Sequence, residues 1–189
     1  IVCLEDGVDG FGRVARGGFD CVVGNPPFMR GELFAKEELK KQEYVLNTYP
    51  SVVSKRADLF VPFLEKCVGL VKPSGWIGLV LPEAFLHVEY AKPLRANLLK
   101  NWSVQSITAY GNEGLFADAN VKACSVVLKG RSAERNKFRY TKIDKNTPYT
   151  LALSKQQLTR RFQNPQIQSQ TFVENRLAKS PNWKFALGM

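Results

Sequence analysis

An asparagine, two prolines and an aromatic residue follow one another directly after an apolar stretch, as Asn25-Pro26-Pro27-Phe28. The Asn25 side chain offers a neutral carbonyl acceptor. The prolines have fixed φ angles and no N–H, so the turn is stiff and the Pro26 carbonyl is also free to accept. Phe28 adds a ring face for stacking. Two acceptors converging on one amino group, beside a flat platform, suit methylation of an amine on a ring. The alternative is a rigid turn that ends a strand and does no chemistry.

The surrounding sequence predicts alternating strands and helices that would position this turn. A continuous apolar run at 19–24 predicts a buried strand leading into it. Apolar residues at helical spacing predict a helix over 57–71, with Asp58 as its N-cap; they are Leu59, Phe63, Cys67 and Leu70, flanked by Phe60 and Leu64. Further strands are expected at 1–4, 76–81, 103–110, 121–129 and, at a sheet edge, 138–143. Further helices are expected at 36–47, at 88–99 with a kink at Pro93, and at 154–162, before a loosely structured tail.

This order of elements predicts an α/β fold, the second half of a doubly wound, mostly parallel sheet with a final antiparallel strand. In such sheets the site lies at the carboxyl ends of the strands. Asp6, the turn at 25–28 and the Leu81-Pro82-Glu83 turn should all lie at that edge. The segment 29–56 is polar and charged, and we expect it to form a mobile loop over the site.

The composition of the chain limits the kinds of partner that it can bind. With 189 residues, of which 44% are hydrophobic, the chain is long enough for one domain with a core. Its net charge of +10 favours a polyanionic partner. Much of the excess positive charge lies in residues 129–161, which contain ten basic residues and only two acidic ones, Glu134 and Asp144. The alternative to a polyanion-binding surface here is a basic surface that is simply solvated. No apolar run approaches the roughly 18 residues of a membrane span, and no signal peptide is evident, so we expect a cytoplasmic protein with no membrane partner.

Several other kinds of site are disfavoured. The four cysteines form no Cys-x-x-Cys pair, which predicts buried, reduced thiols and no zinc site; they are Cys3, Cys21, Cys67 and Cys124. The one histidine, His87, follows an apolar run and is expected to be structural. The glycine-rich segment 7–18 opens no helix, so a dinucleotide loop is excluded there.

Residues 19–28, FDCVVGNPPF, resemble motif IV of S-adenosylmethionine-dependent amino-methyltransferases. The resemblance is greatest to the gamma-type, adenine-specific DNA methyltransferases of restriction–modification systems of prokaryotes. In them the motif is Asp, Asn or Ser, then Pro-Pro, then an aromatic residue. The motif also resembles the NPPY of protein-glutamine methyltransferases and the NPPF of guanine-N2 RNA methyltransferases, and these classes stay open as alternatives.

Two further stretches extend the resemblance over roughly residues 1–130. Residues 58–82 resemble the family's motifs V and VI, in which the position of Phe60 makes an apolar contact with the cofactor adenine. Residues 114–128 resemble motif VIII, which implies that Phe116 stacks on the target base opposite Phe28. A place in the hydrophobic core is the alternative for Phe60 and for Phe116.

The cofactor side of the site is also implied by the resemblance. Glu5-Asp6 resembles the acidic end of a strand whose carboxylate binds the amino group of the cofactor adenine, a role that passes to Asp6. Asn25 is expected to contact the cofactor as well as the target. The family's glycine-rich cofactor loop, of the FxGxG kind, does not occur in the chain.

Together these features imply a DNA adenine-N6 methyltransferase that uses S-adenosylmethionine. The target adenine must be flipped out of double-stranded DNA into a pocket. There Asn25 and the Pro26 carbonyl would accept hydrogen bonds from its two N–H groups, in a turn stiffened by Pro27. Phe28 and Phe116 would stack on the two faces of the adenine ring. No metal or general base is required. A specificity domain or subunit is an expected partner.

The sequence begins at Ile1 without a Met, and we expect a fragment of a longer protein. Residues 1–150 would be the C-terminal half of the catalytic domain. Residues 151–189 would be a linker or the start of a region leading to a target-recognition domain. We expect the fragment alone to bind S-adenosylmethionine poorly and to be inactive. A module that binds DNA without chemistry is the non-enzyme alternative.

Overall fold

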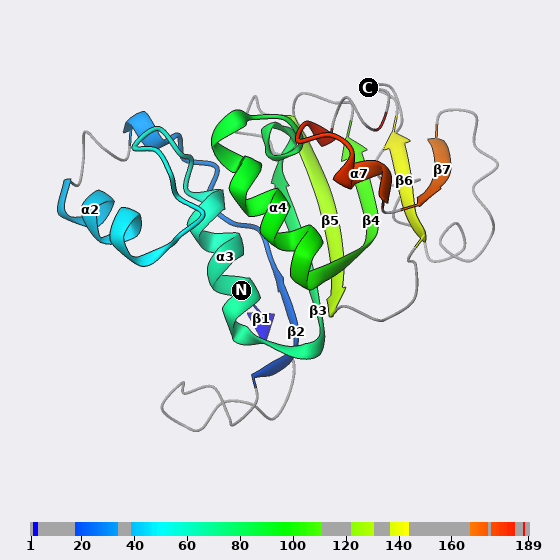
Figure 1. Ribbon diagram of the computed structural model, residues 1–189, viewed down its shortest axis with the longest axis horizontal. Helices are drawn as coiled ribbons and strands as arrows, with labels where there is room; N and C mark the ends of the chain where they lie inside the picture. The colour runs from blue at the N-terminus through cyan, green and yellow to red at the C-terminus, as the bar shows by residue number, and fades with distance from the viewer. Residues whose placement is uncertain are drawn as a thin grey trace.

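The computed structural model describes residues 2–3, 18–33, 39–110, 122–130, 137–143, 167–173, 175–183 and 187. A seven-stranded sheet, in the order β1-β2-β3-β5-β4-β6-β7, forms its centre (Figure 1). The strands are β1 (Val2–Cys3), β2 (Phe19–Gly24), β3 (Val71–Pro82), β4 (Trp102–Tyr110), β5 (Ala123–Gly130), β6 (Lys137–Ile143) and β7 (Ile167–Val173). The helices are α2 (Leu39–Thr48), α3 (Phe60–Leu70), α4 (Lys92–Asn101), α7 (Asn175–Ala178) and the short 3-10 turns η1 (Glu83–Leu86) and η2 (Glu89–Ala91).

The sheet combines parallel and antiparallel pairs. Strands β2, β3, β4 and β6 share one direction, and β1, β5 and β7 run opposite to them. β5 lies between β3 and β4 and is antiparallel to both. The α/β class is therefore confirmed, and the strand expected at 121–129 is present as β5.

Two expectations about the later part of the sheet are wrong. The strand at 138–143 is not an edge, because β6 lies between β4 and β7. The tail is not loosely structured throughout, since Ile167–Val173 pairs along the whole of β6. This strand was missed because its sequence, IQSQTFV, has no continuous apolar run, and its pairing rests on backbone hydrogen bonds. The expected helix at 154–162 lies outside the described residues.

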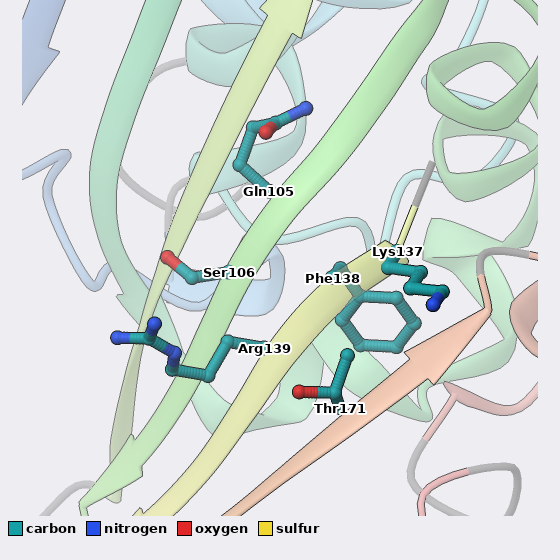
Figure 2. Close-up of a pocket in the computed structure, with 6 residues that line it drawn as sticks. All are labelled: Gln105, Ser106, Lys137, Phe138, Arg139 and Thr171. Atoms are coloured by element: carbon teal, nitrogen blue, oxygen red, sulfur yellow. The ribbon is translucent and has the colours of Figure 1, made fainter. Parts of the chain in front are cut away.

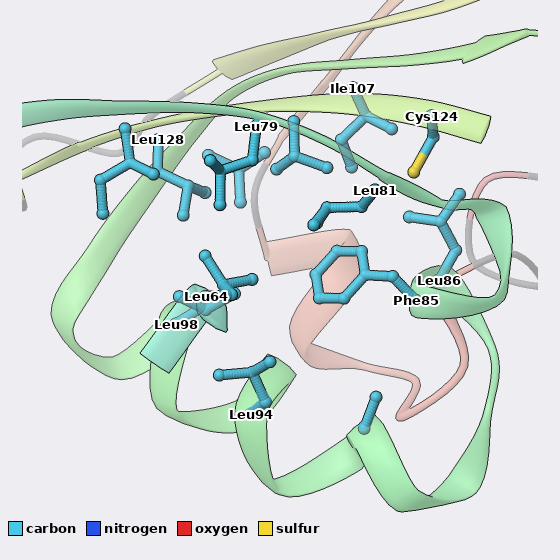
Figure 3. Packing of buried hydrophobic residues seen from close by; sticks show 14 of the residues in the cluster. Leu64, Leu79, Leu81, Phe85, Leu86, Leu94, Leu98, Ile107, Cys124 and Leu128 are labelled. Carbon is cyan, nitrogen blue, oxygen red and sulfur yellow. The ribbon is translucent and has the colours of Figure 1, made fainter. Parts of the chain in front are cut away.

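Helices α3 and α4 cover one face of the sheet (Figure 1). Leu64 of α3 and Leu94 and Leu98 of α4 belong to one buried cluster with Leu79 and Leu128 of the strands (Figure 3). Each of these side chains is at most 2% exposed. Burial on this scale contributes about 1.5–3 kcal/mol for each large apolar side chain, so this layer holds the strands, and the turns that follow them, in place.

The two helices differ in detail from the expected ones. The buried face of α3 is centred on Phe60, Leu64 and Cys67, and Leu59 and Phe63 are only half-buried. The helix expected at 88–99 begins later, as α4, after two 3-10 turns. Pro93 stands in the first turn of α4 and does not kink it, because a proline there costs no intrahelical hydrogen bond.

The described part of the tail packs onto the same core. Arg95 of α4 is 1% exposed and donates hydrogen bonds to the Pro181 carbonyl at 2.8 Å and the Phe85 carbonyl at 2.7 Å. The Trp183 ring meets Phe85 edge-on, with centroids 5.4 Å apart. The described residues of the tail thus belong to this fold, while the division expected at residue 150 lies outside the described residues and stays a prediction.

The opposite face of the sheet is more accessible. Val23 is 45% and Trp76 is 40% exposed. The Lys129 ammonium lies 5.1 Å from the Trp76 ring centroid, over the neighbouring strand. Charged and apolar side chains therefore share this face.

Candidate functional site

The turn at 25–28 lies where the sequence predicts, at the carboxyl end of β2. Parallel pairing of β2 with β3 brings Gly24 opposite Leu79. Asn25 and Pro27 are exposed, Pro26 is buried and Phe28 is half-buried. The buried Pro26 anchors the turn, and the exposed Asn25 presents its amide to solvent. Within the described part of the chain no hydrogen bond occupies that amide, so its carbonyl is available to an incoming amino group.

The chain that follows the turn is held against the start of α3. The Gly31 amide donates to Asp58 Oδ1 at 3.0 Å, and the Leu59 amide donates to the Met29 carbonyl at 3.1 Å. A Cβ at Gly31 would lie 2.4 Å from the Ala57 carbonyl oxygen, so only glycine allows this approach. These contacts fix the position of residues 29–31 and, through them, the exit from the Asn-Pro-Pro-Phe turn.

Asp58 therefore has a different role from the one expected. The N-cap of α3 is Leu59, and no side chain caps the helix. The Asp58 carboxylate instead bridges two segments, because it also accepts a hydrogen bond from the Tyr90 hydroxyl. Burial is the largest cause that raises the pKa of Tyr90 well above its usual range, and the hydrogen bond to Asp58 and the Asp58 charge add to it. The positive charge of Arg30 lowers this pKa, but by less. Tyr90 is thus a neutral donor at physiological pH.

Sequence reasoning did not find the link between Gly31, Asp58 and Tyr90. Each residue lies in a different predicted element, and helical periodicity carries no information about a contact between them. The signals present were a glycine shortly after the turn and a single acidic residue before an apolar helix. Either is common, and only the folded chain shows that they meet.

Phe60 is fully buried in the core of this region. The centroid of its ring lies 6.2 Å from that of Phe85, which it meets edge-on. It also lies 6.2 Å from the centroid of the Tyr90 ring, which is tilted against it. Phe60 has 0% of its surface exposed, so a contact with a cofactor adenine would require one of these rings to move. The cofactor role expected for Phe60 stays a prediction.

The second turn at this edge follows β3. Pro82 and Glu83 are buried, and the Glu83 amide donates to the Lys122 carbonyl at 2.8 Å. Parallel pairing of β2 and β3 brings Asn25 and this turn to the same edge, as expected. Asp6 and Phe116, the other two site residues expected here, lie outside the described residues, and their roles stay predictions.

The segment 29–56 is tied to the rest of the fold. Gln42 of α2 donates from Nε2 to the Lys55 carbonyl at 2.9 Å. The Ser51 amide donates to Glu65 of α3 at 3.0 Å. This segment is therefore anchored to α3, and its expected mobility stays a prediction.

The described thiols are buried or half-buried. Cys67 and Cys124 are buried, as expected, Cys21 is half-buried, and none of the three is in a disulfide. Burial first, and then the charge of Glu83, raises the pKa of the Cys124 thiol far above its usual range, so it stays protonated and unreactive.

Neither a cluster of metal-binding side chains nor a membrane-spanning helix occurs among the described residues. No group of three or more potential metal-binding side chains gathers in this part of the chain. Among the described helices none has both the length and the apolar character to cross a membrane.

Comparison with known proteins gives a consistent result. The family model described as Eco57I restriction-modification methylase matches residues 5–116, more than half of the chain. The restriction enzyme and methyltransferase RM.Eco57I of Escherichia coli is 25% identical over 155 residues, covering 82% of this chain and 15% of that protein. The type II methyltransferase M.BstVI of Geobacillus stearothermophilus is 37% identical over 89 residues, covering 47% of this chain and 15% of that protein. The chain thus spans about 15% of the length of these relatives.

Solved structures show the same fold. A type I restriction-modification methyltransferase subunit from Streptococcus thermophilus matches with a TM-score of 0.61 at 14% identity, over 93% of this chain and 39% of that one. A modification subunit of a putative type I restriction enzyme from Vibrio vulnificus YJ016 matches with a TM-score of 0.60 at 16% identity, over 82% of this chain and 34% of that one. The expected partial Rossmann-like methyltransferase fold is confirmed.

Proposed function

This chain belongs to the Eco57I restriction-modification methylase family, and on that premise we propose that it forms part of a DNA methyltransferase of a restriction–modification system. The enzyme transfers a methyl group from S-adenosylmethionine to the N6 amino group of adenine. The observation that carries this proposal is the Asn25-Pro26-Pro27-Phe28 turn, which exposes Asn25 at the carboxyl edge of β2 while contacts around Gly31 and Asp58 hold the following chain.

The chemistry requires the adenine nitrogen to become a better nucleophile. The Asn25 side-chain carbonyl and the Pro26 backbone carbonyl accept hydrogen bonds from its two N–H groups and favour a pyramidal nitrogen. The stabilisation from these hydrogen bonds grows as charge develops on the nitrogen in the transition state. The Phe28 ring stacks on the base and aims the nitrogen along the line of transfer. When bound, S-adenosylmethionine supplies an electrophilic methyl group on a sulfonium.

The described residues fit the target side of the reaction better than the cofactor side. An exposed amide acceptor beside a half-buried ring suits a flat amine. Phe60 offers no accessible surface to a cofactor ring. We therefore infer that Asp6, Asn25 and regions of the intact protein beyond this chain form most of the S-adenosylmethionine site, and that the chain alone is inactive.

The partners follow from the same proposal. The substrate is double-stranded DNA with the target adenine flipped out, since a base within the stack is out of reach. Phe116 would close the pocket on the opposite side of the base from Phe28. Relatives named as type II methyltransferases, and folds shared with type I modification subunits, support a partner specificity domain or subunit. Such an enzyme works on DNA in the cytoplasm of a prokaryote.

The test is methyl transfer from tritiated S-adenosylmethionine to unmethylated DNA by the intact protein. Asn25→Ala should lower the rate by about 10²–10³-fold, the usual loss of one aimed transition-state hydrogen bond. Asn101→Ala is the matched control, because Asn101 is exposed at the end of α4, at the opposite edge of the sheet. Label should appear as N6-methyladenine.

Other outcomes assign other functions. Label on a protein glutamine or on an RNA guanine would replace the DNA adenine proposal with one of the two related classes. DNA binding without transfer to any of these substrates would establish a non-catalytic module. Equal rates for wild type and Asn25→Ala would remove the turn from the mechanism.

A further inference from the structure

A shallow pocket of about 310 Å³ lies on strands β4, β6 and β7, away from the Asn-Pro-Pro-Phe turn. Its lining combines two cations with hydroxyl and amide groups (Figure 2). The residues are Gln105, Ser106, Lys137, Phe138, Arg139 and Thr171. The lining contains no acidic side chain, and neither cation has an ion-pair partner among the described residues.

Strand register shows which face of the sheet the pocket occupies. Arg139 lies opposite Ser106 on one side and Thr171 on the other, so these three side chains share a face. Phe138 points the other way, since it is 1% exposed and belongs to the core under the helices. The basic pocket therefore opens on the face that α3 and α4 leave uncovered.

The chemistry of this lining selects an oxyanion. A guanidinium offers a planar fork of donors that matches two oxygens of one phosphate, and an ammonium adds a point charge. Ser106 and Thr171 supply hydroxyl donors of the kind that contact DNA phosphates. Lys137 and Arg139 stand two residues apart on one strand face, about 7 Å along the chain, and their mutual repulsion is relieved by a bound anion.

We propose that this pocket binds a phosphate of the DNA backbone, at a place separate from the reacting base. This inference rests on the proposed function. Four strand spacings of about 4.8 Å separate β2 from β6, so the pocket lies roughly 19 Å across the sheet from the strand that carries Asn25. Such a contact sets the position and orientation of the duplex and carries no base sequence information.

DNA is favoured over an acidic protein by the charge of the whole chain. The chain carries a net charge of +10, five times that of the two pocket cations, and a long polyanion such as DNA is attracted by the charge of the whole protein.

The experiment compares two charge-matched double variants of the intact protein. Lys137→Gln with Arg139→Gln removes the pocket cations. Lys66→Gln with Lys142→Gln removes two exposed charges elsewhere, Lys66 from α3 and Lys142 from the β6 face opposite Arg139. Affinity for a labelled DNA duplex is measured by fluorescence anisotropy from about 50 to 200 mM salt.

The pocket variant should show a salt slope smaller by about 0.9, since this is what one lost phosphate contact removes from the slope of log K against log salt. The control pair should keep the wild-type slope. Arg139→Lys, which retains the charge, should fall close to wild type in slope.

Three results would overturn the inference. Equal slopes for the two double variants, with methylation intact, would remove the pocket from DNA binding while leaving the proposed function in place. Loss of binding to polyglutamate with unchanged DNA binding would assign the pocket to an acidic protein. A wild-type protein that neither binds nor methylates DNA would refute the proposed function itself.

Discussion

The Asp58 carboxylate accepts a hydrogen bond from the Gly31 amide at 3.0 Å, although 27 residues separate them in the chain. The same carboxylate accepts from the Tyr90 hydroxyl. The half-buried Asp58 carboxylate thus joins three segments: the chain leaving the Asn-Pro-Pro-Phe turn, the start of α3, and η2. The rigidity of the turn comes from its prolines, but its placement relative to the helical layer comes from Asp58.

Asp58→Ala should slow methyl transfer by about ten- to a hundredfold, because displacement of reacting groups by even 1 Å costs up to about 10² in rate. The affinity for DNA should change much less, since Asp58 is not expected to touch substrate. Asp58→Asn retains an acceptor oxygen and should recover most of the rate. Single-turnover kinetics of the intact protein measure this, with Asp20→Ala as the control for loss of an exposed carboxylate. A purely structural Asp58 would change stability and leave the rate per folded molecule unchanged.

Gly31→Ala should destabilise the fold by about 1–3 kcal/mol, the usual range for an inserted methyl that has no space. The added carbon would lie 2.4 Å from the Ala57 carbonyl oxygen. Gly69→Ala is the matched control, because nothing lies within 4 Å of a Cβ at that position in α3. It should stabilise by about 0.5–1 kcal/mol through helix propensity. Urea denaturation measures both, and equal effects would contradict the close approach at Gly31.

Tyr140→Phe should be neutral or slightly stabilising at pH 7. The Tyr140 hydroxyl is buried and has no hydrogen-bond partner in the described structure, so its removal relieves a desolvation cost. Differential scanning calorimetry at pH 7 tests this. A loss above about 1 kcal/mol would indicate a partner for the hydroxyl that the fold does not show.

The same residue makes stability depend on pH in the alkaline range. Burial first, and then the charge of Glu83, raises the pKa of Tyr140 to about 12. Below pH 10 the phenol is neutral in both the folded and the unfolded chain, so it does not make the free energy of unfolding depend on pH. Between pH 10 and 12 only the unfolded chain ionises, so stability falls, by up to about 1.4 kcal/mol per pH unit for one group. Urea unfolding of Tyr140→Phe across this window should show a shallower decline than wild type, and parallel declines would refute this assignment.

Arg95→Met should cost about 2–4 kcal/mol, because it leaves buried carbonyls without donors. Its guanidinium donates to Phe85, Val88 and Pro181, and burial lowers the pKa of Arg95 to about 10. Limited proteolysis should then cut within 175–183 sooner than in wild type. Lys92→Met, which removes an exposed cation from the same helix, is the control, and equal cleavage rates would show that Arg95 does not hold the tail.

Much of the fold could be predicted because its signals are local. The apolar run before Asn25, the apolar stripe of α3 and the strand at 103–110 each lie within one window of sequence. The turn at 25–28 was found because two prolines and an aromatic residue form a contiguous pattern. What failed was non-local: the pairing of β7 with β6 depends on backbone hydrogen bonds rather than an apolar pattern, and the bond from Gly31 to Asp58 joins residues that no periodicity connects.

The position of β5 has a consequence for the way this sheet assembles. β2 with β3, and β4 with β6, are two parallel pairs, and β5 joins them by pairing with β3 on one side and β4 on the other. Because β5 follows β4 in the chain, the facing edges of β3 and β4 stay open until residues 123–130 have been synthesised. Open strand edges invite pairing with other chains, and pairing at long sequence separation is slow. The interval before β5 inserts is therefore when the nascent protein is most exposed to aggregation, and a chain that ended before Ala123 would leave β3 with an unsatisfied edge.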